Sequence, residues 1–361
     1  MNVEEIVCDK PIHSINKKEL WKETIEVWDY LVESGYGPSD FFGGEIKMNY
    51  QGFKKLINEN GKCARVKETR HYRISAVWIG NVEISFTEVK IDKDDWCLEN
   101  NWHFIHPHFR GPNWTKDACG SDKAVQDIID AIDYMKQNHK IDTQRIYLMG
   151  SSGGGHMALL MAGRHPEIWA GVSAWVPISD IYSWWQENDK HKKHKKYARH
   201  IEKVVGGRLD QNKFARKQAQ LRSPNNFLSA AQKVNIDISA GIYDGHKGGS
   251  VAFTHSLTAF NSIVPPKDRL PKKLINTFYE KQSLPPELPQ ASKDPLYGKK
   301  ELIFRKQTQH TRVNIFKGGH EIISHAALNW LKEQKKGQAA IWKPSSIYTL
   351  SKSINKHKSG L

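Results

Sequence analysis

The residues with the clearest chemical potential lie in the run Gly150-Ser151-Ser152-Gly153-Gly154. A short apolar segment, residues 145–149, precedes this run, and a helical pattern, residues 156–163, follows it. A strand, a Gly-x-Ser-x-Gly turn and a helix together expose a serine hydroxyl above a sheet. Ser152 would then stand at a helix N-terminus, whose dipole favours negative charge. A plain glycine-rich turn is the alternative, although the run lacks a P-loop ending and Gly-x-Gly-x-x-Gly spacing.

Two later strand ends offer the partners that a serine nucleophile needs. Residues 236–242 have the pattern of a strand that leads to Asp244, and residues 311–316 of one that leads to His320. A serine hydroxyl becomes a strong nucleophile when a histidine takes its proton and a carboxylate fixes the histidine tautomer. The chain order serine, acid, histidine is that of α/β-hydrolases. We therefore predict Ser152 as nucleophile, Asp244 as acid and His320 as base.

Three other side chains compete for these roles. Asp180 follows the strand predicted after Ser152, and some hydrolases place the acid there. His156 lies on the helix after the serine, and His246 lies beside Asp244, so neither is expected to reach the hydroxyl. A histidine base also predicts that activity falls in acid, because a protonated imidazole cannot accept the serine proton.

The elements that must position these residues alternate along the chain. From residue 96 to 335, segments with the pattern of a strand alternate with helical patterns. Trp102 to His106 is predicted as a strand, and residues 121–138 as a helix because apolar residues recur on one face. This alternation predicts an α/β fold, with a mostly parallel sheet covered by helices on both faces. Functional residues should lie beyond the carboxyl ends of the strands.

The region before this alternation has a different pattern. Two alternating runs on either side of Gly80-Asn81 predict a β-hairpin within residues 72–91. We assign residues 1–71 to an N-terminal segment of unknown function and residues 72–342 to a catalytic domain, recognisable from about residue 96. Residues 343–361 form a basic C-terminal tail.

Residues 96 to 342 resemble the catalytic domain of the prolyl oligopeptidase family of serine hydrolases. The resemblance rests on four segments, which are residues 106–114, 150–156, 241–246 and 316–321. It implies an α/β-hydrolase fold, the same three residues in the same roles, and cleavage of peptide or carboxylic ester bonds. It also implies that neither a metal ion nor an organic cofactor takes part. Small peptides or esters are the expected substrates.

The second oxyanion donor is the point at which the sequence departs from this family. One donor is the backbone N–H after the nucleophile, here that of Gly153. The other usually comes from a His-Gly-type or aromatic-Gly loop before the strand at Trp102, and no such loop is found. Loss of one donor lowers turnover by about 10²–10³. The sequence therefore predicts a reactive Ser152 with slow turnover, and residues 72–95 are where a second donor would be sought first.

A basic insertion, residues 180–222, lies where hydrolases of this fold carry a lid. Trp184 and Trp185 border it, and they would either line a substrate pocket or pack in a core. From residue 190 to residue 222 the chain has twelve Lys and Arg but only two acids. Such runs are usually solvated surfaces.

Composition bounds the remaining possibilities. The net charge of +15 suggests weak polyanion binding through the basic segments. It also supports an alternative function, that of a catalytically weak or inactive binding protein of this fold with an acidic partner. No run of eighteen apolar residues and no apolar signal core is present, so we expect no membrane span and a cytoplasmic location. The four cysteines are expected to be reduced thiols.

Overall fold

The computed structural model describes residues 96–97, 100–107, 109–110 and 113–344, together with the backbone of three short strands before them. The chain divides into two compact units, Met1–Asn101 and Trp102–Leu361. The expected boundary between residues 71 and 72 lies outside the described residues, and so does the basic tail from residue 345 onward.

The first unit contains a small antiparallel sheet. Its strands are β1 (Cys63–Val66), β2 (Val77–Ile79) and β3 (Val82–Ile84), in the order β1-β2-β3. Strand β2 pairs with β3 through Ile79 and Val82, which leaves two residues for the connection. The predicted hairpin is therefore confirmed, whereas β1 had no signal in the sequence.

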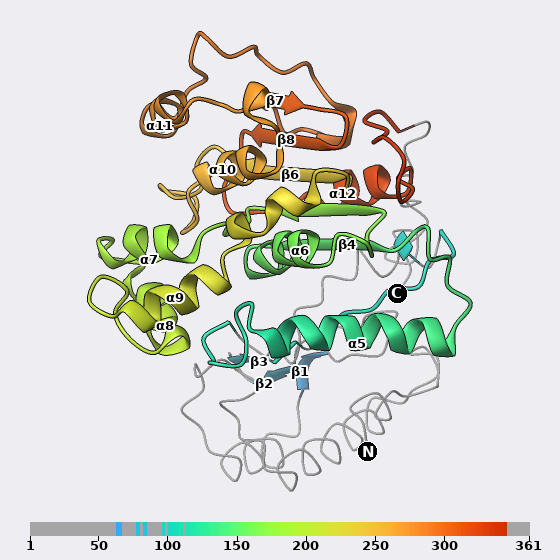
Figure 1. The fold of residues 1–361 in the computed structure, drawn as a ribbon, viewed down its shortest axis with the longest axis horizontal. Helices are drawn as coiled ribbons and strands as arrows, with labels where there is room; N and C mark the ends of the chain where they lie inside the picture. The colour runs from blue at the N-terminus through green and yellow to red at the C-terminus, as the bar shows by residue number, and fades with distance from the viewer. Residues whose placement is uncertain are drawn as a thin grey trace, which may run out of the picture. The chain divides into compact units, whose positions relative to one another are not determined.

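The second unit is built on a five-stranded sheet in the order β4-β5-β6-β8-β7. Strands β4 (Tyr147–Ser151), β5 (Gly171–Trp175), β6 (Ile236–Gly241) and β8 (Thr311–Phe316) run parallel to one another. Strand β7 (Leu302–Gln307) pairs antiparallel with β8 at the edge, as the arrowheads in Figure 1 show. The mostly parallel sheet is confirmed, and the antiparallel edge strand is an addition.

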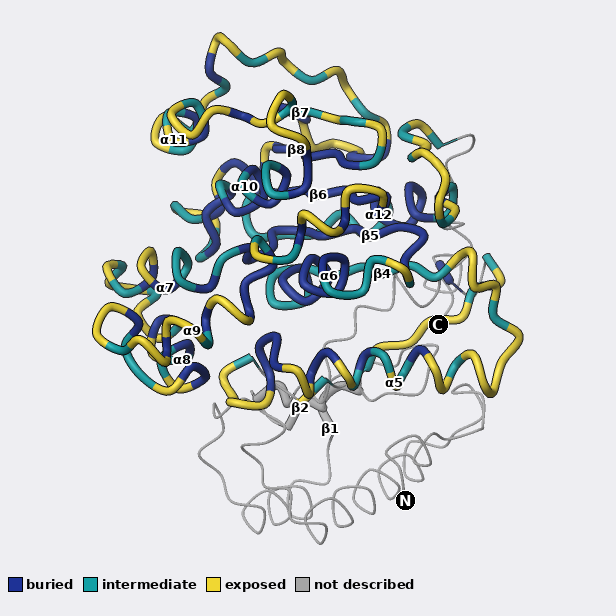
Figure 2. Tube along the Cα trace, viewed as in Figure 1, coloured by how far each residue is buried: buried dark blue, intermediate teal, exposed yellow. Residues whose placement is uncertain are grey.

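The central strands lie inside the hydrophobic core, as Figure 2 shows. Every residue of β5, β6 and β8 is buried, as expected for parallel strands that are covered on both faces. The helices in contact with the sheet are α6 (Gly153–Arg164), α10 (Thr254–Ile263) and α12 (Ser324–Leu331). Helix α5 (Asp122–Asn138) begins at Ser121, whose hydroxyl caps it, and buries the predicted face in the same core.

The predicted strand at Trp102 to His106 is wrong. These residues are irregular, and the side chains of Phe104 and Ile105 are exposed. The indole of Trp102 instead stacks on the ring of Tyr147 in β4, with 4.8 Å between ring centroids. A short apolar run does not indicate whether another strand lies beside it. Here Trp102 is held by the stacking of its side chain on Tyr147.

The proline-rich segment that follows α10 is more ordered than its composition suggests. It contains the short 3₁₀ helices η5 (Pro266–Asp268) and η6 (Pro295–Tyr297), with helix α11 (Lys272–Lys281) between them. Among the helices that the structure describes, none is long and apolar enough to cross a membrane.

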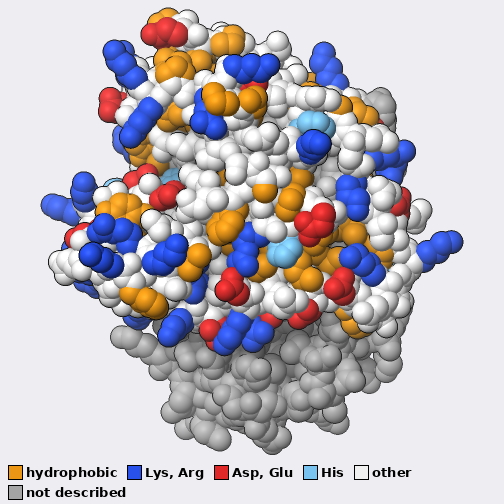
Figure 3. Space-filling view, viewed as in Figure 1, with side chains coloured by type: hydrophobic (Ala, Val, Ile, Leu, Met, Phe, Trp, Pro, Cys, Tyr) orange, Lys and Arg blue, Asp and Glu red, His pale blue; other side chains and the backbone are white. Residues whose placement is uncertain are grey.

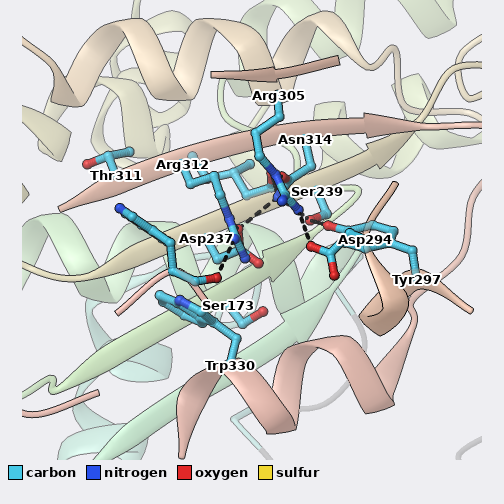
Figure 4. A network of polar contacts seen from close by, with 12 residues as sticks. Ser173, Asp237, Ser239, Asp294, Tyr297, Arg305, Thr311, Arg312, Asn314 and Trp330 are labelled. Carbon is cyan, nitrogen blue, oxygen red and sulfur yellow. Dashed lines mark hydrogen bonds and ion pairs between the residues drawn. The ribbon is translucent and has the colours of Figure 1, made fainter. Parts of the chain in front are cut away.

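A buried ion pair joins the amino-terminal ends of β6 and β8 (Figure 4). The guanidinium of Arg312 lies 2.7 Å from the carboxylate of Asp237, and both side chains are almost completely buried. Asn314 donates a second hydrogen bond to the same carboxylate oxygen. The indole ring of Trp342 covers the guanidinium, at 4.8 Å from the ring centroid. This pair lies at the end of the strands opposite the serine turn, so we assign it to stability rather than chemistry.

The basic insertion folds as three helices beyond the carboxyl ends of the parallel strands (Figure 1). They are α7 (Ile181–Asp189), α8 (Lys195–Val205) and α9 (Lys213–Leu221), and the two 3₁₀ turns η3 (Pro224–Asn226) and η4 (Leu228–Ala231) lead back to β6. The apolar faces of these helices form a second hydrophobic core around Trp185, Ile201 and Val205. We refer to α7, α8 and α9 as the helical insertion.

Candidate active site

Ser152 occupies a strained turn between β4 and α6. Its backbone has φ of 56° and ψ of −118°, a combination that a residue with a side chain rarely adopts. The Ser152 N–H donates to the carbonyl of Trp175 on the neighbouring strand, which holds the turn in place. Residue 150 must be glycine because a Cβ there would collide with the Gly154 carbonyl. The predicted sharp turn is therefore present.

The first N–H groups of α6 have no acceptor inside the helix. The first intrahelical bond runs from the His156 N–H to the Ser152 carbonyl. The amides of Gly153 and its neighbour are therefore available to a ligand. Together with the helix dipole, they favour negative charge beside Ser152.

Asp244 and His320 meet across the ends of β6 and β8. His320 Nδ1 lies 2.7 Å from Asp244 Oδ2. The carboxylate is completely buried, whereas the imidazole keeps 27% of its side-chain surface exposed. The other oxygen, Asp244 Oδ1, accepts from the N–H groups of Gly245 and Val251. A buried carboxylate held this way makes the histidine carry its proton on Nδ1, which leaves Nε2 free to accept one.

The competing residues are engaged elsewhere. Asp180 caps the N-terminus of α7, where its carboxylate accepts from the Ser183 N–H. His246 stacks on Tyr279 and contacts its carbonyl oxygen through Nε2. His156 is buried, and its Nε2 lies 2.7 Å from the carbonyl oxygen of Arg222. Of the two candidate acids, only Asp244 is placed beside His320.

A cavity of about 400 Å³ opens beside Ser152 and His320, a size typical of small-molecule sites. The helical insertion supplies much of its wall, and the loop before α5 supplies another part. The lining side chains are mostly apolar or aromatic, and they include Trp114, Ile178, Ile181, Trp184, Tyr197 and Ile201. The sequence left two outcomes open for Trp184 and Trp185. Trp184 lines the cavity. Trp185 packs in the second hydrophobic core, and its indole N–H donates to Glu202.

The lining of the cavity differs from the basic exterior of the helical insertion. None of the described residues that line it is an Asp, Glu, Lys or Arg. Burial lowers the pKa of His156 to about 4, and burial also lowers the pKa of His194 and His200. Burial raises the pKa of the Cys119 thiol to about 11. These side chains therefore add no charge to the cavity, despite the basic exterior of the insertion.

The loop before α5 brings a side chain against the serine turn that we had assigned no role. Asn113 lines the cavity together with Ser152 and Gly153. Its Nδ2 occupies the space in which residue 153 would carry a Cβ, so only glycine fits there. The motif around Asn113 is visible in the sequence, but nothing in its composition indicates which of its residues faces the serine.

Comparisons with known proteins show which proteins this chain resembles. The sequence model of the prolyl oligopeptidase family matches residues 107–233. A search of curated proteins found no match. Similar solved structures include an acylaminoacyl peptidase of Pyrococcus horikoshii, at 18% identity and a TM-score of 0.33, which covers 42% of this chain and 22% of that chain. Another is a puromycin hydrolase, at 15% identity and a TM-score of 0.34, which covers 40% of this chain and 20% of that one.

The mostly parallel sheet with the serine turn at a strand end has the arrangement of the α/β-hydrolase fold. The family model supports the resemblance seen in the sequence, since it matches residues 107–233 of this chain. The chain spans only about a fifth of the length of the solved structures to which it is similar.

Proposed function

We propose that this chain cleaves peptide or carboxylic ester bonds through an acyl-enzyme on Ser152, with His320 as base and Asp244 as acid. The observation that carries the proposal is the 2.7 Å contact between His320 Nδ1 and the buried Asp244. His320 lines the same cavity as Ser152. The strained serine turn supports the same roles, because such strain is retained mainly at functional sites.

The reaction follows from the protonation states. Ser152 Oγ attacks the carbonyl carbon while His320 Nε2 takes its proton, and the carbonyl π electrons move onto oxygen. The resulting oxyanion lies at the N-terminus of α6, where the Gly153 N–H donates to it. The imidazolium then gives its proton to the leaving amine or alkoxide as the bond to carbon breaks. Water attacks the acyl-enzyme by the same steps, with His320 again as base, and Ser152 is regenerated.

The cavity wall indicates the kind of substituent next to the scissile bond. Aromatic and aliphatic side chains surround the space, and no charged side chain among the described residues faces it. Burying an unpaired charge there would be costly, whereas an uncharged apolar group gains from leaving water. We therefore propose that substrates place a neutral, bulky group under the helical insertion.

A fluorophosphonate probe tests the proposed nucleophile. The folded protein should be labelled at Ser152, and the Ser152→Ala variant should not. The neighbouring Ser151 makes a matched control, and the Ser151→Ala variant should label like the parent protein. Equal labelling of Ser152→Ala, or no labelling of the folded parent protein, would remove the proposal.

The binding-protein alternative depends on the basic charge of the insertion. Two of its cations are already committed, since Arg208 pairs with three carboxylates and Arg222 is buried. On the face in Figure 3, Lys and Arg side chains are spread among acidic and apolar ones rather than gathered in one patch. A steep loss of polyanion binding with added salt would support this alternative. Binding no tighter than that of an unrelated protein of equal charge would remove it.

A further inference from the structure

We infer that the side-chain amide of Asn113 is the second oxyanion donor, which rests on the proposed acyl-enzyme chemistry at Ser152. The sequence offers no family-type loop for this role, and residues 85–95 lie outside the described part of the chain. Asn113 is placed where the missing donor is needed. It would hold the oxygen that becomes negative as Ser152 Oγ bonds to the substrate carbon.

The position of the amide follows from covalent geometry. Asn113 Nδ2 lies where a Cβ of residue 153 would stand. The Cβ and the backbone nitrogen of any residue are bonded to the same Cα, so Nδ2 lies close to the Gly153 N–H. Both donors border the cavity that contains Ser152 and His320. Both groups therefore lie close together on the part of the cavity wall that Ser152 also lines.

The orientation of the amide follows from hydrogen bonding. The Cys119 N–H lies 3.1 Å from Asn113 Oδ1. A backbone N–H can only donate, so the side-chain atom that faces it must be the carbonyl oxygen. The NH₂ group is left on the side of Gly153. The donor is therefore directed before any substrate arrives, which is the condition for strong stabilisation of a developing charge.

Arg222, at the end of the helical insertion, holds the loop that carries this amide. Its guanidinium is buried and donates to the carbonyl oxygens of Lys116, Ala118 and Cys119. The bond to the Ala118 carbonyl fixes the peptide group whose N–H, that of Cys119, donates to Asn113. We regard Arg222 as a positioning residue, since it acts on the reaction only through this loop.

The surroundings favour a bound oxyanion. The Cys119 thiol lines the cavity near Asn113, and burial raises its pKa to about 11, so it stays neutral at pH 7. Burial lowers the pKa of His156 to about 4, so that side chain also stays neutral. No described carboxylate lines the cavity to repel the developing charge. With Asn113 as donor, turnover should be that of an ordinary hydrolase rather than the slow turnover that the sequence predicts.

The Asn113→Asp variant tests the inference most sharply. It keeps the oxygen that accepts from the Cys119 N–H but replaces the donor facing Gly153 by an acceptor. With p-nitrophenyl butyrate we expect kcat to fall by at least about 10²–10³ while KM changes little. Asn113→Ala should lose kcat by a similar factor. Asn226 lies outside the cavity, where its side-chain NH₂ donates to the Gln220 carbonyl. Asn226→Asp makes the same chemical change away from Ser152, so it is the control and should keep full kcat.

Two results would overturn the inference. One is a kcat of Asn113→Asp within about threefold of the parent value, since a lost oxyanion donor costs far more. The second result comes from a structure of the unmodified protein with a peptidyl trifluoromethyl ketone bound to Ser152. This experiment needs no variant, so it tests the inference even if Asn113→Asp fails to fold. The hemiketal oxygen should lie about 3 Å from Asn113 Nδ2, and a clearly longer distance assigns the role elsewhere. If Ser152 labels and turns over normally while Asn113→Asp is unaffected, only this inference fails, whereas an unreactive Ser152 removes the proposed function itself.

Discussion

Replacing Asp244 by asparagine should nearly abolish turnover, because two backbone N–H groups dictate how the new amide must sit. In the parent protein, Oδ1 accepts from Gly245 and Val251 at 3.0 and 3.2 Å, and Oδ2 faces His320 Nδ1. An amide has one oxygen, and the two N–H groups require it at the Oδ1 position. The NH₂ group is then turned toward the histidine. A donor facing Nδ1 forces the ring proton onto Nε2, which can no longer accept a proton from Ser152.

The magnitude follows from comparing the two amide orientations. In the opposite orientation, the amide oxygen would accept from His320 Nδ1, but the N–H groups of Gly245 and Val251 would face an NH₂ group. Each of these two buried N–H groups would then lack an acceptor, which costs about 1–3 kcal/mol per group. The unproductive orientation should therefore dominate. A serine hydrolase with the wrong histidine tautomer loses about 10⁴ in kcat, or about 5.5 kcal/mol in the barrier. The fold should survive, since asparagine has nearly the same shape as aspartate.

The assay compares initial rates of ester hydrolysis for Asp244→Asn and Asp180→Asn. Asp180 is the rival acid in the sequence, and it caps α7 through the Ser183 N–H. Asparagine caps a helix as well as aspartate does, so Asp180→Asn should keep activity within about twofold. A loss smaller than about tenfold in Asp244→Asn would refute the tautomer argument. Equal losses in both variants would show that neither residue has the special role.

Three further predictions concern stability and specificity. Burial lowers the pKa of His156 to about 4 in the folded state, whereas in the unfolded state this side chain takes up its proton at about pH 6.5. The free energy of unfolding should therefore decrease by about 3 kcal/mol as the pH falls from about 6.5 to about 4. The His156→Gln variant should lose clearly less stability on acidification in urea titrations, and an equal loss would contradict the buried neutral state. Asp237→Asn leaves the buried Arg312 charge unpaired and should lower the free energy of unfolding by about 3–5 kcal/mol. Asp133→Asn breaks an exposed ion pair and should lower the free energy of unfolding by less than about 1 kcal/mol. Similar losses of stability in both variants would show that burial is not the cause. Tyr197→Ala removes an aromatic side chain from the cavity wall, so kcat/KM for a naphthyl-bearing ester should fall about three- to tenfold. The kcat/KM for the corresponding acetate ester should stay the same. An equal fall for both esters would place the Tyr197 ring outside the substrate pocket.

Local features of the sequence were sufficient for much of the fold. The strand that leads into Ser152, the glycines of its turn and the helix after it are contiguous, so their pattern predicts the turn directly. Helix 121–138 was equally predictable, because its apolar residues recur with the helical period. In the buried strands β6 and β8, apolar residues alternate with Asp237, Ser239, Arg312 and Asn314. This alternation is typical of a strand. The run at Trp102 also has strand-forming residues, yet it pairs with no strand of the described residues, so a local pattern alone could not separate the two cases.

The sequence alone determined the class of the protein and the candidates for its chemistry, since chain order and strand ends already point to Ser152, Asp244 and His320. The sequence already favoured Asp244 over Asp180, and the tertiary structure places only Asp244 beside His320, because that contact depends on which strand ends lie next to each other. Trp184 and Trp185 are adjacent in the chain, yet one faces the cavity and the other the core of the insertion. Asn113 reaches the serine turn through a loop held by Arg222, more than a hundred residues away. Such contacts arise from packing between distant segments, and no local pattern records them.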